Sequence, residues 1–255
     1  MQPRRLSIIV FRMRLIIQVL IALVALRVPV DAQERAFQCD PRKKISLKEG
    51  EALIDKVQAR YQDEKSIRAK FYQYSFLAAL ETSELSSGDV LFLKPGQMRW
   101  NYKEPEIQIF LVKDGTVWFY QAAERQVMVN EFEKVILSDL PVAFLMGLGN
   151  LRRDFTFKGG CRNNDGIVLD LRSLPKPEKS RESGEQSELA GFKLLIDPQT
   201  NFPRGAEVAH IGGNLTSILL AEVELGAKLD ASMFEPVFPK GTDTNDLRTR
   251  PVEVR

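Results

Sequence analysis

The stretch "LVKDGTVWFYQ", residues 111–121, predicts a β-hairpin and thereby sets the fold class. Its Asp114-Gly115 pair lies between two runs of β-branched and aromatic residues, the strongest short-range signal for a tight hairpin turn. The strand after the turn is apolar on both faces, with Val117 and Phe119 on one and Trp118 and Tyr120 on the other. A strand with one solvated face should alternate apolar and polar residues. We therefore expect both faces of this strand to be covered.

Further strands surround this hairpin and extend it into a sheet. The segment "GDVLFLKPGQMRWNY", residues 88–102, predicts a strand, a Pro-Gly turn and a second strand. On that second strand Met98, Trp100 and Tyr102 share one face, and polar side chains lie opposite. Because the strands follow one another closely in sequence, an antiparallel sheet is expected, in a fold that is mainly β with some α.

Two helices are expected beside the sheet. The pattern "SLKE", residues 46–49, is a capping box, in which the Ser46 and Glu49 side chains satisfy free backbone N–H groups at the start of a helix that should run to about Tyr61. The stretch "LSDLPVAFLMGLGN", residues 137–150, predicts a short helix that is apolar on every side and needs cover on every side. A sheet wrapped around these helices encloses either a dry core or a lipid-sized cavity, and the pattern leaves both open.

The N-terminal residues 1–32 have the pattern of a cleaved signal peptide, with Met13 as an alternative start to Met1. They carry five arginines and one aspartate, net +4, so the remaining residues are net −2 although the whole chain is +2. The apolar run at residues 15–26 is shorter than the ~20 residues that span a bilayer, which favours cleavage, after Ala32, over a membrane anchor. The acidic mature part argues against nucleic-acid binding.

The mature chain divides into one domain with flanking segments. We expect a flexible lead-in at residues 33–45, a domain at 46–243 and a polar tail at 244–255. Inside the domain, the insert at residues 175–188 is charged and almost without apolar residues, which is typical of a surface loop.

Cysteine and histidine content limits the chemistry of the chain. Its two cysteines, Cys39 and Cys161, form either a disulfide, as an oxidising compartment favours, or two buried thiols. With these cysteines and a single histidine, a zinc site is not expected. No phosphate-binding loop, nucleophile elbow or Cys–His pair occurs, so we predict a protein that is not an enzyme and carries no cofactor or metal.

Two segments resemble the family of periplasmic outer-membrane lipoprotein carriers, LolA. They are "GDVLFLKPGQMRWNYKEP", residues 88–105, and "VKDGTVWFYQAAERQVMV", residues 112–129. The proline-led apolar helix at 140–148 and the closing "FEPVFPKG", residues 234–241, also match in order. The resemblance covers roughly residues 46–243, and the ordered set of motifs is specific where each motif alone is not.

This resemblance implies an unclosed antiparallel β-barrel, a half-barrel, covered by a helical lid over a hydrophobic cavity. Acyl chains and the lid would then cover the second face of the hairpin strand. The residues implied for the cavity and lid are Met98, Trp100, Tyr102, Leu111, Phe119, Leu140, Phe144, Leu145 and Leu148. The family usually has an arginine before the turn proline, where it helps to hold the lid closed. Here Lys94 stands in that position, so lid closure is expected to be weaker or differently arranged.

The implied function is that of a monomeric periplasmic carrier of acylated lipoproteins. An inner-membrane ABC transporter would supply the lipoproteins, and an outer-membrane receptor would accept them. The receptor shares the fold but is itself a lipoprotein, and Cys39 lacks the sequence context of lipid attachment. Two alternatives remain open: a carrier of phospholipid or glycolipid with the same fold, and a LolA-like periplasmic sensor or adaptor.

Overall fold

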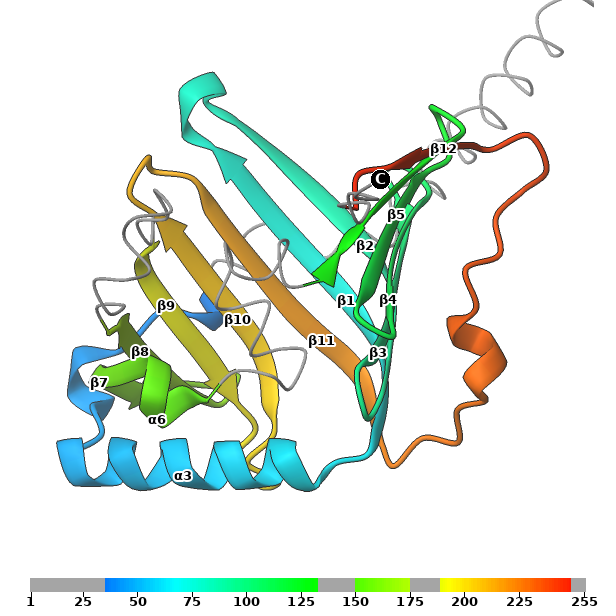
Figure 1. Cartoon of the computed structure of the whole chain (residues 1–255). Helices are drawn as coiled ribbons and strands as arrows, with labels where there is room; N and C mark the ends of the chain where they lie inside the picture. Colours follow the sequence, from blue (N-terminus) through cyan, green and yellow to red (C-terminus); the bar gives the residue numbers. More distant parts are fainter. Residues whose placement is uncertain (1–34, 133–149, 175–188, 249–255) are drawn as a thin grey trace, which may run out of the picture.

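The computed structural model describes residues 35–132, 150–174 and 189–248, and Figure 1 shows its single bent sheet. The expectations for the signal peptide at 1–32, for Leu140, Phe144, Leu145 and Leu148, and for the insert at 175–188 lie outside the described residues. The strands are β1 (Ser66–Leu77), β2 (Thr82–Leu93), β3 (Gln97–Glu104), β4 (Gln108–Lys113), β5 (Thr116–Gln121), β6 (Gln126–Glu131), β7 (Phe155–Arg162), β8 (Ile167–Ser173), β9 (Leu189–Ile196), β10 (Pro203–His210), β11 (Leu215–Leu225) and β12 (Asp243–Asp246).

The sheet has twelve strands in the order β12-β6-β5-β4-β3-β2-β1-β11-β10-β9-β8-β7. Neighbouring strands are antiparallel except for β12, which pairs with β6 in parallel. The end strands β7 and β12 do not pair with each other, so the sheet is an unclosed half-barrel. This confirms the expected fold class, mainly β with helices beside an unclosed antiparallel sheet.

The hairpin that decides the fold is formed by β4 and β5. Asp114 and Gly115 adopt φ angles of 47° and 71°, the left-handed conformations that a two-residue hairpin turn requires. The turn fixes the register, and two neighbouring pairs, Phe110 with Phe119 and Leu111 with Trp118, lie directly opposite each other across the strands. Because successive side chains alternate, these pairs lie on opposite faces of the sheet.

The face that carries Phe110 and Phe119, here called the inner face, holds the main core. Direct pairing across the ladder places apolar side chains of β8, β9, β2 and β3 on this same side. Buried members of the two clusters on this face include Leu169, Phe192, Leu194, Ala206, Leu220, Phe71, Val90, Trp100, Val112 and Val117. The apolar inner face is therefore continuous across both halves of the sheet.

Helix α3 (Leu47–Asp63) packs on the β7–β10 half of the inner face (Figure 1). Ser46 caps it as expected, its Oγ accepting the Glu49 N–H at 3.2 Å, whereas the Glu49 carboxylate pairs with Arg162 at 2.5 Å instead of completing the capping box. Leu53, Ile54 and Val57 form its buried stripe. The short helix α6 (Leu151–Asp154) lies beside α3. No helix in the described ranges is long and apolar enough to cross a membrane.

The opposite face, here called the outer face, is covered at the β7–β10 end by the N-terminal segment. Ala36 and Phe37 are 2% and 1% exposed and pack against Val168 and Leu195. The Cys39–Cys161 disulfide and the 3-10 helix η1 (Pro41–Lys43) hold this segment against β7. The expectation of a flexible lead-in is therefore wrong from residue 35 onward, because Phe37 has an apolar site to fill.

The C-terminal segment covers the other end of the outer face (Figure 1). Phe234, in the 3-10 helix η4 (Ala231–Phe234), is fully buried, and the Phe238 ring stacks on Tyr120 at 5.3 Å between centroids. Residues 244–246, expected to belong to the polar C-terminal tail, are part of β12, which pairs with β6. The chain itself thus covers the second face of the hairpin strand, which corrects the expectation that acyl chains and a lid do so.

Reduction of the Cys39–Cys161 bond should lower the free energy of unfolding by about 2–4 kcal/mol, because the bond restricts the unfolded chain across a long loop. Urea unfolding with and without dithiothreitol measures this loss. The Cys39→Ser, Cys161→Ser double variant is the control, since reductant should leave its unfolding curve unchanged. Coincident curves for oxidised and reduced wild-type protein would contradict the stabilising role.

Candidate functional site

An aromatic cluster on the inner face of β1–β3 is the candidate ligand-binding surface. Trp100 lies at its centre, with ring centroids 4.8 Å from Phe71 and 6.3 Å from Phe92. Tyr102 contacts Phe71 edge-on at 4.9 Å. These offset and edge-to-face contacts hold the four rings together in one apolar cluster.

Gly88 permits this clustering. A Cβ atom at this position would lie 1.8 Å from the Asn101 carbonyl oxygen and 2.9 Å from the Phe71 ring. Any larger residue would push β3 away from β2 or displace Phe71, so the glycine lets Phe71 lie between β2 and the Tyr102 ring.

Two polar groups lie in the cluster, the Tyr102 hydroxyl and the Trp100 indole N–H, and only the first has a hydrogen-bond partner among the described residues. The Tyr102 hydroxyl donates to Gln73 Oε1 at 3.0 Å, and burial raises the Tyr102 pKa to about 12. The phenol therefore stays neutral at physiological pH. The Trp100 indole N–H is buried and has no hydrogen-bond partner within the described part of the chain. A buried unpaired donor costs free energy that an acceptor atom of a ligand would recover.

The structure brings together four of the expected binding residues and separates a fifth. The strand registers place Met98, Trp100, Tyr102 and Phe119 on the inner face. Leu111 pairs with Arg99 and Trp118, so it lies on the outer face, where it is fully buried. Its expected place in the cavity is wrong, because the tight turn after β4 gives Leu111 the face of Trp118.

Sequence reasoning missed Phe71 and Phe110 as parts of this surface. Phe110 lies opposite both Trp100 and Phe119, and Phe71 is fully buried between Trp100 and Tyr102. The alternation of apolar and charged residues along 66–71 indicates that Phe71 faces the core. Its neighbours on β2 and β11 follow only from the strand pairing, which the sequence does not specify.

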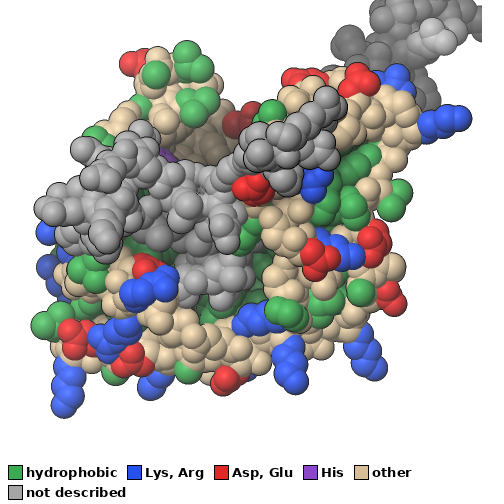
Figure 2. Space-filling model, viewed as in Figure 1, with side chains coloured by type: hydrophobic (Ala, Val, Ile, Leu, Met, Phe, Trp, Pro, Cys, Tyr) green, Lys and Arg blue, Asp and Glu red, His purple; other side chains and the backbone are tan. Residues whose placement is uncertain are grey.

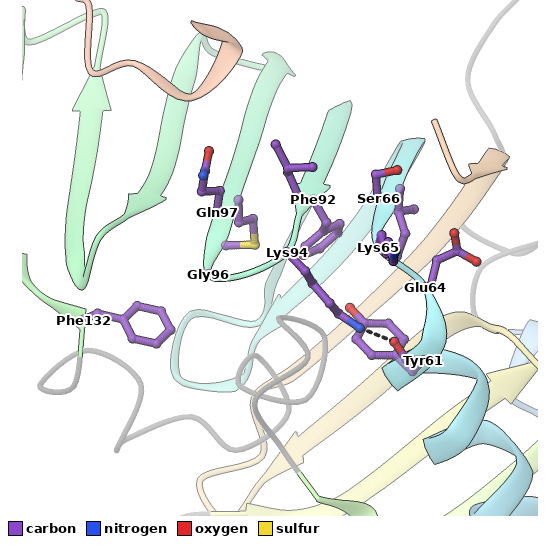
Figure 3. Close-up of a pocket in the computed structure, with 12 residues that line it drawn as sticks. Tyr61, Glu64, Lys65, Ser66, Phe92, Lys94, Gly96, Gln97 and Phe132 are labelled. Atoms are coloured by element: carbon purple, nitrogen blue, oxygen red, sulfur yellow. Dashed lines mark hydrogen bonds between the residues drawn. The ribbon is translucent and has the colours of Figure 1, made fainter. Parts of the chain in front are cut away.

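Lys94 lies at the C-terminal end of α3 (Figure 3). Its ammonium donates to the backbone carbonyl oxygens of Tyr61 and, at 3.1 Å, Gln62, and lies 5.2 Å from the centre of the Tyr61 ring. A cation here complements the unpaired carbonyls and negative dipole end of the helix. Partial burial lowers the Lys94 pKa below its ordinary value. Among described residues, Lys94 thus fixes the end of α3 to the β2–β3 turn.

The pocket between α3 and the β1–β3 strands is small, about 20 Å³ in volume. Figure 3 shows the Lys94 side chain reaching toward Tyr61. The other residues that line the pocket include Phe92, Met98 and Phe132. Ligand pockets for drug-sized molecules typically measure ~300–1,000 Å³. This pocket beside the described aromatic cluster is therefore far smaller than a cavity that would hold an acyl chain.

Charged groups lie around the surface and not within it. In Figure 2, lysine and arginine side chains project along the lower edge of the molecule, where Figure 1 places α3. Within residues 35–132, 150–174 and 189–248, no three His, Cys, Asp or Glu side chains are grouped to hold a metal ion. The described inner face offers apolar contact, the Trp100 hydrogen-bond donor and the hydrogen-bonded pair of Tyr102 and Gln73.

Comparison with known proteins specifies the family to which this half-barrel belongs. The family model described as "Outer membrane lipoprotein carrier protein LolA" matches residues 62–237. This range is more than half of the chain, so the chain belongs to the LolA family. The expectation that it is not an enzyme agrees with membership in a family of carriers.

Relatives named "Outer-membrane lipoprotein carrier protein" are similar over most of their length. The one from Cupriavidus pinatubonensis is 26% identical over 195 residues, 75% of this chain and 86% of the relative. The one from Methylococcus capsulatus is 27% identical over 180 residues, 70% of this chain and 80% of the relative. Among solved structures, a LolA superfamily protein from Nitrosomonas europaea has a TM-score of 0.39 and 13% identity, covering 73% of this chain and 97% of that one.

Replacing Lys94 with alanine should lower the free energy of unfolding by about 1–2 kcal/mol, because two carbonyls at the end of α3 lose a cationic donor. The Lys94→Arg variant keeps a cationic donor and should lose less than the alanine variant. Urea unfolding of the three proteins at pH 7 measures the difference. An alanine variant as stable as wild type would contradict the capping role.

Proposed function

We propose that this protein is a periplasmic carrier that binds the acyl chains of lipoproteins on its inner face. An inner-membrane lipoprotein-releasing ABC transporter would supply the cargo, and an outer-membrane receptor would accept it. The carrier would act as an exported monomer after cleavage of residues 1–32. The observation that carries the proposal is the continuous apolar inner face centred on Trp100, in a chain that belongs to the LolA family.

Energetics require a surface of this kind. Each acyl CH₂ shielded from water contributes roughly 0.8 kcal/mol, so a lipoprotein cannot leave a membrane unless its carrier shields most of its chains. The inner-face aromatic and aliphatic side chains supply that shielding without charged groups that would need desolvation. Release to a receptor then requires only that the receptor offer a slightly better apolar surface.

The unpaired Trp100 N–H suits a cargo that carries ester carbonyls at the head of its acyl chains. An ester oxygen accepts a hydrogen bond, whereas a plain hydrocarbon cannot. Lipoproteins and diacyl phospholipids share this chemistry. The Lys94 departure from the family's usual arginine keeps phospholipid or glycolipid as the alternative cargo, because a lysine cannot reproduce the planar fork of donors of an arginine.

A matched pair of substitutions on β5 tests the carrier function. Phe119 and Trp118 are adjacent, half-buried aromatic residues on opposite faces. Phe119→Ser should weaken capture of a radiolabelled triacylated lipoprotein by about tenfold, the loss expected when one aromatic contact to an acyl chain is removed. Trp118→Ser, the control on the outer face, should capture lipoprotein within a factor of about two of wild type.

Lipoprotein release from spheroplasts, followed by native mass spectrometry of the carrier, gives the readout. Equal capture by the two variants would contradict the assignment of the inner face. A wild-type protein that emerges with bound phospholipid or glycolipid, and never with lipoprotein, would establish the alternative cargo.

A further inference from the structure

Strands β10 and β11 pair along only part of their length. The ladder between them extends from the pair Ala209 and Leu215 to the pair Gly205 and Leu219, where it ends. Past the Gly205–Leu219 pair, four residues of β11 pair with β1 on one side, namely Leu220, Ala221, Glu224 and Leu225, and residues 220–225 pair with no described strand on the other. Figure 1 shows the two strands diverging toward this end. One edge of β11 is therefore open inside the sheet.

Local chemistry accounts for the separation. Pro203 begins β10 and has no N–H to donate, and the β9–β10 ladder shifts register between Pro203 and Gly205. The preceding turn satisfies its own donors, since Asp197 Oδ1 accepts the Gln199 and Thr200 N–H groups at 2.9 Å each. Glu222 on β11 has a left-handed φ of 50°, which marks a bulge in that strand.

The separation creates a hollow of about 240 Å³, here called the β10–β11 slot. Its apolar lining comes from Phe202, Leu220, Val223 and Leu225, and these four residues also belong to or pack against the Trp100 cluster. Its rim carries the exposed Arg204 and Glu222 and the polar Asp197 and Thr200. The slot thus connects the inner-face core with polar groups at the surface.

We propose that the β10–β11 slot binds the extended peptide that follows the acylated residue of a lipoprotein, adding it as a strand to residues 220–225 of β11. The inference rests on the proposed function, since the acyl chains must lie on the inner face for the peptide to leave through the slot. The peptide backbone would exchange hydrogen bonds with the open edge of β11, and the slot's polar rim would face the emerging chain.

An extended peptide fits this site better than an acyl chain does. A strand edge presents alternating N–H and C=O groups, which a hydrocarbon would bury without partners at a cost in free energy. Main-chain hydrogen bonding also gives affinity that does not depend on side chains, so one slot serves cargo proteins of different sequence.

Hydrogen–deuterium exchange of the full mature protein with three synthetic ligands tests this assignment. The first is a diacylated lipopeptide with an uncharged ten-residue peptide, the second is the same lipopeptide N-methylated at every second peptide bond, and the third is diacylglycerol. The lipopeptide should slow exchange of amides in residues 220–225 at least tenfold, as expected when a solvated strand edge becomes paired. Diacylglycerol should leave those amides unchanged while protecting the inner-face strands.

N-methylation removes peptide donors and leaves the acyl chains intact. The N-methylated lipopeptide should bind about tenfold more weakly than its parent, the loss expected for one or two net hydrogen bonds, and should not protect residues 220–225. Residues 82–86 of β2, an edge without a β3 partner, provide the internal control and should exchange equally in all states.

Three results would overturn the assignment. Binding of both lipopeptides with equal affinity and no protection at 220–225 would exclude strand addition and leave the carrier function intact. Protection of 220–225 by diacylglycerol would show that the slot holds the lipid and not the peptide. Absence of inner-face protection with every ligand would remove the proposed function and the slot assignment together.

Discussion

The structure depends on the burial of strands that are apolar on both faces, such as β5 and β8. Such strands cannot leave either face in water, and the fold meets this constraint differently on the two sides. On the outer face the chain supplies its own cover, with Phe37 near one end of the chain and Phe234 near the other. On the inner face α3 covers the β7–β10 half, and the aromatic surface around Trp100 occupies the β1–β5 half.

Under the proposed function, the outer side serves stability and the inner side serves cargo. The disulfide and the buried phenylalanines fix the outer side, so apolar contacts there do not compete with a ligand. Lys94 holds the end of α3 against the β2–β3 turn at the border of the inner surface. The β10–β11 slot lies beside the inner face and has an apolar lining and a polar rim. A lipoprotein with its acyl chains on the inner face would pass its peptide to solvent through this slot.

Sequence reasoning predicted what depends on short-range pattern. The Asp114-Gly115 turn, the Ser46 cap and the common face of Met98, Trp100 and Tyr102 all follow from residues close in sequence. The wrong face expected for Leu111 concerns the local register of the β4–β5 hairpin, whereas two other failures depend on contacts between distant segments. Phe37 packs on strands more than one hundred residues away, as the 122-residue separation of the disulfide illustrates, so the lead-in was expected to be flexible. The parallel pairing of β12 with β6 had no local signal either.

Under the proposed function, acyl chains bind the inner face, and the chain's own ends cover the outer face. Photo-crosslinking distinguishes the two faces, using a lipopeptide with a diazirine near the end of one acyl chain and residue-level mass spectrometry of the adducts. Binding on the inner face should give adducts on residues such as Trp100, Phe110 and Phe119. Adducts confined to outer-face residues such as Leu111, Trp118 and Phe234 would contradict it.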